Sequence, residues 1–170
     1  MPRPAGRGDP RVSGYRLAIA GLPEGPSHLT VLGEGADLEL PFDAWSEPLS
    51  VDLQVDRMGE QLALRGRLRG VGRAECARCL EEFSLTLDAG FAALAVRGGR
   101  LAGDAESLAG EDYVLPHDGR ALDLTDAVRE QVLLSLPMVL LCRPDCAGLC
   151  LQCGANRNTA PCSCTSEARD

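Results

Sequence analysis

The sequence predicts an α+β fold: a small antiparallel β-sheet arranged as a meander, one main C-terminal helix and a cysteine-rich tail. Apolar and polar residues alternate in the centre of the chain, apolar residues recur at helical spacing between Asp123 and Leu136, and few apolar side chains other than cysteines follow Leu141. A period of two is typical of half-buried strands, whereas spacings of three and four are typical of a helix.

The composition favours a soluble protein with one core. The chain has 170 residues, 45% of them hydrophobic and 25% charged, which is enough for one core and a small appended module. No apolar run reaches the roughly 18 residues of a membrane span. The Pro-, Gly- and Arg-rich residues 1–13 lack the apolar centre of a secretory signal. We therefore expect a cytoplasmic protein with a disordered N-terminus over residues 1–13.

The body of the fold is expected over residues 14–137, with its clearest strands in the centre. A strand near residues 15–19, a turn at 21–26 and a weak strand at 36–40 are expected first. Residues 49–56, 62–69 and 83–91 then alternate apolar with polar side chains, as half-buried strands do. Their short connections favour antiparallel pairing, which gives the meander.

The second part of the body is expected to hold a loop, a turn and the helix. Residues 97–112 are rich in Gly and acids and predict a loop, and Asp118-Gly119-Arg120 predicts a turn. Asp123 can cap a helix that ends at Pro137. Its apolar face is expected to be widened by three leucines, namely Leu133, Leu134 and Leu136.

The tail, residues 138–170, is predicted to bind metal. Too few of its side chains are apolar for their burial to offset the conformational entropy lost on folding, so this segment needs an additional cross-link such as a bound metal. Cys-x-x-Cys pairs place two thiolates on one turn, as a tetrahedral zinc site requires, and Gly154 lets backbone amides turn toward the sulfurs. The candidate ligands for one or two structural zinc ions are Cys76, Cys79, Cys142, Cys146, Cys150, Cys153, Cys162 and Cys164.

Two partitions of these cysteines are open. In one, Cys150, Cys153, Cys162 and Cys164 form a site in the tail, and the other four can form a second. In the other, the first Cys-x-x-Cys pair joins part of the tail in a single site. Cys142, which follows two leucines, could instead be a small buried apolar residue.

No constellation of catalytic residues is apparent, so we expect a protein that is not an enzyme. His28 and His117 fall in predicted loops and are expected to be solvated. The alternatives are a thiol oxidoreductase that uses Cys76 and Cys79, or a zinc store or donor. A reactive Cys-x-x-Cys usually opens a helix, whereas this pair connects two predicted strands.

The positive charge is concentrated in one segment. The chain carries a net charge of −8, but residues 61–80 hold five arginines against one acid, a net charge of +4 that leaves −12 elsewhere. These arginines form a row that could be the solvated face of a strand, or that could contact the phosphates of structured RNA. The candidates for RNA contact are Arg65, Arg67, Arg69, Arg73 and Arg78.

Four motifs in order resemble those of a known family. These are Cys76-x-Arg78-Cys79-Leu80-Glu81-x-Phe83, Asp118-Gly119 with Leu122-Asp123-Leu124, the segment from Glu130 and Leu133 to Pro137, and Cys142-x-x-Asp145-Cys146-x-Gly148-Leu149-Cys150-x-x-Cys153-Gly154-x-Asn156. Together they resemble the YceD family, the large ribosomal RNA subunit accumulation proteins, over roughly residues 45–165. After the second Cys-x-x-Cys pair, the family usually has Asn-Leu-Asn, whereas this chain has Asn156-Arg157-Asn158. The packing of that leucine is therefore lost.

The resemblance implies a function in ribosome assembly. It implies a non-enzymatic, cytoplasmic bacterial protein that promotes accumulation or processing of large-subunit ribosomal RNA. The implied partners are that RNA, a ribosomal protein, or both. Neither a membrane nor a small-molecule substrate is expected.

Overall fold

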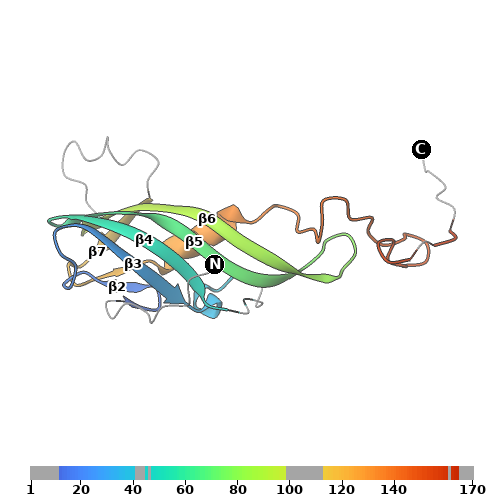
Figure 1. Ribbon diagram of the computed structural model, residues 1–170, viewed down its shortest axis with the longest axis horizontal. Coiled ribbons are helices and arrows are strands. Elements are labelled where there is room, and N and C mark those ends of the chain that lie inside the picture. Colours follow the sequence, from blue (N-terminus) through green and yellow to red (C-terminus); the bar gives the residue numbers. More distant parts are fainter. Residues whose placement is uncertain (1–11, 41–44, 46, 99–112, 161, 165–170) are drawn as a thin grey trace. The chain divides into compact units, whose positions relative to one another are not determined.

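A five-stranded sheet in the order β3-β4-β5-β6-β7 dominates the fold (Figure 1). The structure is a computed structural model that describes residues 12–40, 45, 47–98, 113–160 and 162–164. β3 pairs antiparallel with β4, and β4 with β5, whereas β6 and β7 are parallel. The five strands are β3 (Gly25–Gly33), β4 (Leu49–Met58), β5 (Gln61–Glu75), β6 (Glu82–Arg97) and β7 (Tyr113–His117).

The three central strands confirm the predicted meander. β4, β5 and β6 cover the three alternating segments, and β5 and β6 extend further than expected. Leu62, Leu64 and Leu68 are buried on one face of β5, and the intervening arginines are exposed on the other. The first Cys-x-x-Cys pair lies in the connection between β5 and β6, as predicted.

A smaller sheet and a helix cover the apolar face of the large sheet. The strands β1 (Val12–Ser13), β2 (Arg16–Ala18) and β8 (Ala121–Asp123) form the second sheet, and helix α2 (Thr125–Ser135) follows β8. Their buried side chains join those of the large sheet in one core cluster. The prediction of a mainly antiparallel β fold with one C-terminal helix is confirmed.

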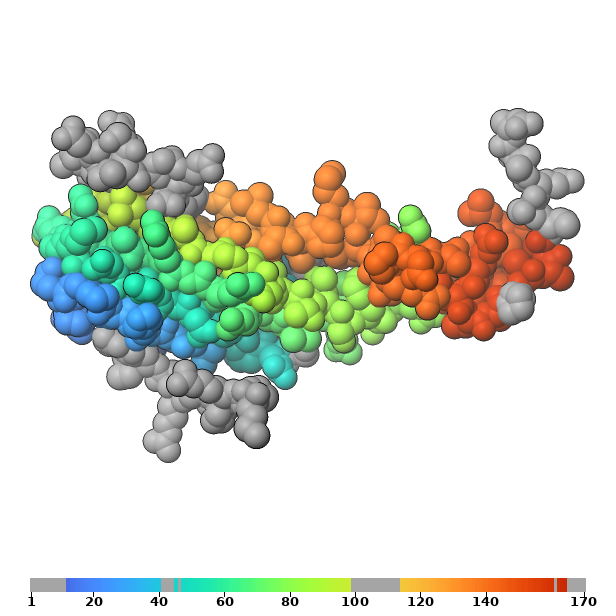
Figure 2. Space-filling view, turned by 45° about the horizontal axis from the view of Figure 1, so that its top comes forward, coloured from blue at the N-terminus to red at the C-terminus, as the bar shows by residue number. Residues whose placement is uncertain are grey.

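The helix buries a narrower stripe than expected. The N-cap of α2 is Leu124, which makes no side-chain capping hydrogen bond, so the predicted cap at Asp123 is displaced by one residue. Asp123 Oδ1 instead accepts hydrogen bonds from the backbone N–H and hydroxyl of Thr125, the first residue of the helix. Ala127, Val128 and Val132 are buried, and Leu136 packs against the core as predicted. Leu134 is 73% exposed and Leu133 is at the surface, so these two leucines do not widen the buried face as predicted. Figure 2 shows the exposed side of α2 in orange.

Two local predictions in the body were also wrong. Residues 25–33, expected to be a turn and irregular chain, form β3, where Pro26 is tolerated because β3 is an edge strand. The weak strand at 36–40 is the 3-10 helix η1 (Gly35–Leu38). The predicted loop begins after Arg97, since β6 runs to that residue, and 99–112 lie outside the described residues.

The chain divides into two compact units. Unit 1 comprises residues 1–72 and 86–136, and unit 2 comprises residues 73–85 and 137–170. The predicted boundaries of 14–137 and 138–170 remain a prediction, and residues 1–11 of the predicted disordered N-terminus lie outside the described residues. Among the described residues, no helix has both the length and the apolar content to cross a membrane.

Candidate metal centres and the arginine face

The structure brings the eight cysteines into two groups of four, both in unit 2. The first group is Cys76, Cys79, Cys142 and Cys146, and the second is Cys150, Cys153, Cys162 and Cys164. Within each group, all sulfurs lie within 4.8 Å of one another. Either group could therefore hold a metal ion.

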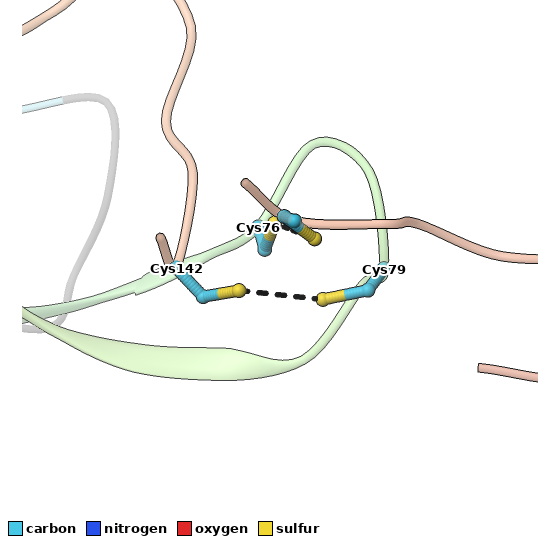
Figure 3. Close-up of side chains that lie close together, drawn as sticks. Cys76, Cys79 and Cys142 are labelled. Carbon is cyan, nitrogen blue, oxygen red and sulfur yellow. Dashed lines mark hydrogen bonds between the residues drawn. The ribbon is translucent and has the colours of Figure 1, made fainter. Parts of the chain in front are cut away.

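The first group joins the β5–β6 connection to the tail. Cys76 Sγ lies 3.7 Å from Cys146 Sγ, and Cys79 Sγ lies 3.7 Å from Cys142 Sγ. Figure 3 shows Cys79 and Cys142 pointing toward each other from these two segments. Four sulfurs at about 2.3 Å from a zinc ion define a tetrahedron with edges of about 3.8 Å. The two measured separations fit that geometry.

Both Cys-x-x-Cys pairs adopt the same backbone turn. The N–H of Leu80 donates to the carbonyl of Cys76, and the N–H of Gly154 donates to the carbonyl of Cys150, at 2.9 and 2.8 Å. Both residues have positive φ, +60° for Leu80 and +71° for Gly154. Glycine accepts this backbone without cost, whereas Leu80 is a non-glycine residue in the left-handed region.

Burial and hydrogen bonds set the ionisation of the first group. Burial of Cys76 opposes ionisation, but the backbone N–H groups of Cys142, Arg78 and Cys79 outweigh it and lower the pKa of Cys76 to about 6. Burial and the neighbouring thiols, that of Cys146 foremost, raise the pKa of Cys142 to about 12. Four thiolates would repel one another in this space, and a divalent cation would offset that repulsion.

The second group likewise contains one cysteine whose pKa is lowered and one whose pKa is raised. Hydrogen bonds from the backbone N–H groups of Cys153 and Gln152 lower the pKa of Cys150 to about 6. The side chain of Cys153, together with burial, raises the pKa of Cys164 to about 12. Among the residues that the structure describes, the donor set of each group is four thiols with no carboxylate or imidazole, which is typical of a closed structural site.

The tail is held to the hairpin connection by backbone bonds and a small core. Ala77 N–H donates to Leu140 O at 2.9 Å, and Leu149 N–H donates to Arg78 O at 3.1 Å. Cys76, Cys79 and Cys146 are the buried members of this core, against which Phe83, Leu141, Cys142 and Leu149 pack. Among the described residues, the fully buried members of this small core are thus all cysteines.

The arginines of β5 point outward, but acids on neighbouring strands offset their charge. Arg67 Nε contacts Asp88 Oδ1 of β6 at 2.5 Å, and Arg69 Nη1 contacts Asp52 Oδ2 of β4 at 2.8 Å. The hydrogen bond from Arg67 lowers the pKa of Asp88. Arg65 forms no ion pair with any of the described residues. The row is therefore a face of mixed charge rather than a uniformly positive patch.

The other two arginine candidates lie in unit 2 and differ from each other. Arg73 is exposed near the end of β5. Arg78 lies within the first Cys-x-x-Cys pair, and its Nη1 donates to Cys146 O at 3.1 Å. Arg78 therefore already has a structural contact in the first cysteine group.

Both histidines lie in strands rather than in the predicted loops, but only His117 departs from the predicted solvation, since His28 is exposed. His28 is in β3, opposite Gln54. His117 ends β7 and is buried, with Nε2 2.8 Å from Glu60 O and Nδ1 accepting from Gly119 N–H at 3.0 Å. Because Nδ1 accepts, Nε2 carries the proton, and the ring connects strand ends.

Comparison with known proteins decides the family. The family model described as "Large ribosomal RNA subunit accumulation protein YceD" matches residues 64–170. The chain belongs to the YceD family. The match includes all eight cysteines of the two groups and the arginines of β5 from Arg65 onward.

Curated relatives agree with this membership. The chain is 30% identical over 130 residues to an uncharacterized protein of Mycobacterium leprae, covering 73% of this chain and 56% of the relative. It is 30% identical over 150 residues to the chloroplastic YCED homolog 1 of Zea mays, which is named for large ribosomal RNA subunit accumulation. That match covers 72% of this chain and 50% of the relative. The chain thus spans about half the length of these curated relatives. No solved structure matches.

Proposed function

We propose that this protein is a ribosome biogenesis factor that promotes accumulation of large-subunit ribosomal RNA without enzymatic chemistry. Membership of the YceD family carries the proposal, since the family is named for that process. In this proposal the body presents a binding surface, and the two cysteine groups hold zinc that keeps unit 2 folded.

The structural role of zinc is supported by the donor sets. Each group offers four thiols at separations that suit one ion, so four thiolates would fill a tetrahedral shell. A filled shell leaves no open position for a reactant. A thiol oxidoreductase would instead need a free Cys76–Cys79 pair, and a zinc donor would need rapid exchange. Thiols that do not react in the purified protein would oppose the oxidoreductase. Slow exchange of the bound zinc with an added zinc isotope would oppose the zinc donor.

The outward face of β4, β5 and β6 is the proposed surface for RNA. The exposed Arg65 forms no ion pair with any residue that the structure describes, so it is the strongest candidate in this row for a phosphate contact. Exposed ion pairs such as Arg67–Asp88 and Arg69–Asp52 contribute little to stability, because water and salt screen them. A phosphate can therefore replace Asp88 or Asp52 as the partner of these arginines at small cost.

Replacing Asp88 by asparagine is expected to strengthen binding to transcribed large-subunit ribosomal RNA. The change frees Arg67 and removes one negative charge from the face. Affinity measured at several salt concentrations should show a steeper salt dependence, by about 0.7–0.9 in the log–log slope for each additional phosphate that the protein neutralises. Replacing Arg65, Arg67 and Arg69 together by alanine should flatten the slope.

Glu130→Gln is the matched control, because it removes the same charge from an exposed position of α2. This variant should leave the RNA affinity and the slope nearly unchanged. An unchanged slope in the triple arginine variant would contradict the RNA assignment. Weaker binding of Asp88→Asn to a basic ribosomal protein, with no effect on RNA, would favour the alternative in which the acids of this face are the contact.

A further inference from the structure

The segment that connects the cysteines of the second group also contacts a sulfur of the first. Asn158 lies between Cys153 and Cys162 in the sequence, yet its Nδ2 donates to Cys146 Sγ at 3.3 Å. A hydrogen bond to a thiolate ligand offsets its charge and orients it, as partners of metal ligands commonly do. A residue in the loop of one group thus supports a candidate ligand of the other.

The orientation of the Asn158 amide is fixed by its other partners. Its Oδ1 accepts from Ala147 N–H at 2.8 Å and from Arg143 Nη2 at 2.6 Å. Its Nδ2 also donates to Asn156 Oδ1 at 2.9 Å. Since both donors to Oδ1 are N–H groups, the reversed amide would place its own N–H donors against each of them. The NH2 group therefore faces the sulfur.

The position of Asn158 depends on the path of residues 154–160. Arg157 N–H donates to Gly148 O at 2.9 Å, Cys150 N–H donates to Ala155 O at 2.8 Å, and Leu149 forms a bridge with Asn156. In the sequence, Cys153 precedes this segment and Cys162 follows it, and both belong to the second group. A metal bound there would close the loop and reduce the conformational entropy lost when Asn158 reaches Cys146.

We propose that the two cysteine groups bind metal cooperatively, with Asn158 as the residue that couples them. Metal in the second group closes the loop, and the ordered Asn158 then stabilises the Cys146 thiolate in the first. Coupling of binding free energies is reciprocal, so metal in the first group favours metal in the second equally. Asn158 is a positioning residue rather than a ligand. The inference rests on the proposed metal binding.

Zinc affinity of the first group, measured by competition with a chelator in four chains, tests the coupling. The chains are the unchanged protein, Asn158→Ala, the pair Cys162→Ser with Cys164→Ser, and all three substitutions together. Asn158→Ala is expected to lower the affinity about 10- to 100-fold, as loss of a ligand's hydrogen-bond partner does. Disabling the second group should cause a similar loss when Asn158 is present and little further loss when it is absent.

Two controls separate coupling from damage to the tail. Arg157→Ala changes an adjacent, exposed side chain and should leave both affinities unchanged. In a Cys79→Ser chain, Asn158→Ala should not alter the zinc affinity of the second group. A loss there would make Asn158 a general structural residue and overturn the proposal.

With Co2+ as a probe, removing Asn158 should shift thiolate-to-metal charge transfer to lower energy, because the sulfur loses a hydrogen bond. An unshifted band in Asn158→Ala would overturn the contact. Equal first-group affinities in all four chains would overturn both the support of Cys146 by Asn158 and the coupling, but not the proposed metal binding. A protein that binds no zinc would overturn the proposed metal function itself.

Discussion

Replacing Cys79 by serine is expected to reduce the bound zinc from two ions per chain to one and to expose unit 2 to proteolysis. Cys79 is buried in the small core that joins the hairpin connection to the tail, and among the described residues the fully buried members of that core are all cysteines. Structural zinc contributes roughly 10–16 kcal/mol in small zinc-dependent domains, so the remaining contacts cannot compensate. Elemental analysis and limited proteolysis measure the two effects.

Unit 1 should survive this substitution, because all eight cysteines lie in unit 2. Leu151→Ser is the matched control: Leu151 lies between Cys150 and Cys153 but is fully exposed, so both zinc ions should be retained. Two zinc ions in the Cys79→Ser protein would contradict the assignment of Cys79 as a ligand. An unchanged proteolytic pattern would contradict the dependence of unit 2 on metal.

Replacing Gly66 by alanine is expected to destabilise unit 1 by about 3 kcal/mol or more, at the upper end of overpacking effects. A Cβ at Gly66 would lie within van der Waals overlap of the carbonyl oxygen of Asp52 on the adjacent strand. Backbone in a paired strand cannot move aside without breaking its hydrogen bonds, so β4 and β5 would have to separate locally. Urea denaturation followed by the fluorescence of the single tryptophan, Trp45, measures the loss.

Gly90 provides the contrast on the neighbouring strand β6. A Cβ there meets nothing within 4 Å, so Gly90→Ala should change the free energy of unfolding by less than about 0.5 kcal/mol or stabilise slightly. Equal denaturation midpoints for the two variants would show that β4 and β5 accommodate the added carbon.

The central strands could be predicted because one face of each is fully buried. Leu62, Leu64 and Leu68 alternate with arginines, and only a strand places such a set on one side. β3 was missed because its apolar alternation is limited to Leu29 and Val31, and its remaining positions hold residues that an edge strand tolerates. β7 is short, contains Pro116 and pairs with β6, so its formation depends on a strand elsewhere in the chain.

The chemistry was predictable in kind but not in arrangement. Cysteine spacing indicated metal ligands, yet which four share a group depends on where the tail meets the β5–β6 connection. The arginine row was visible in the sequence, but its neutralisation was not. Asp52 of β4 comes within reach of Arg69 only in the register that the structure adopts, in which Asp52 lies opposite Arg67. Asp88, the partner of Arg67, lies on β6, the other strand of the hairpin. Asn158 stood out only as part of a motif.

The long separation between the ligands of the first group has a consequence for the order of events during synthesis. Cys79 and Cys142 are 63 positions apart, and the intervening chain includes β6, β7, β8 and α2. On the ribosome, the hairpin pair emerges as two thiols that must wait while unit 1 is completed, and domains generally fold as units during translation. A fully coordinated ion in the first group is therefore a late event, and its presence would mark a nascent chain whose body has already been made.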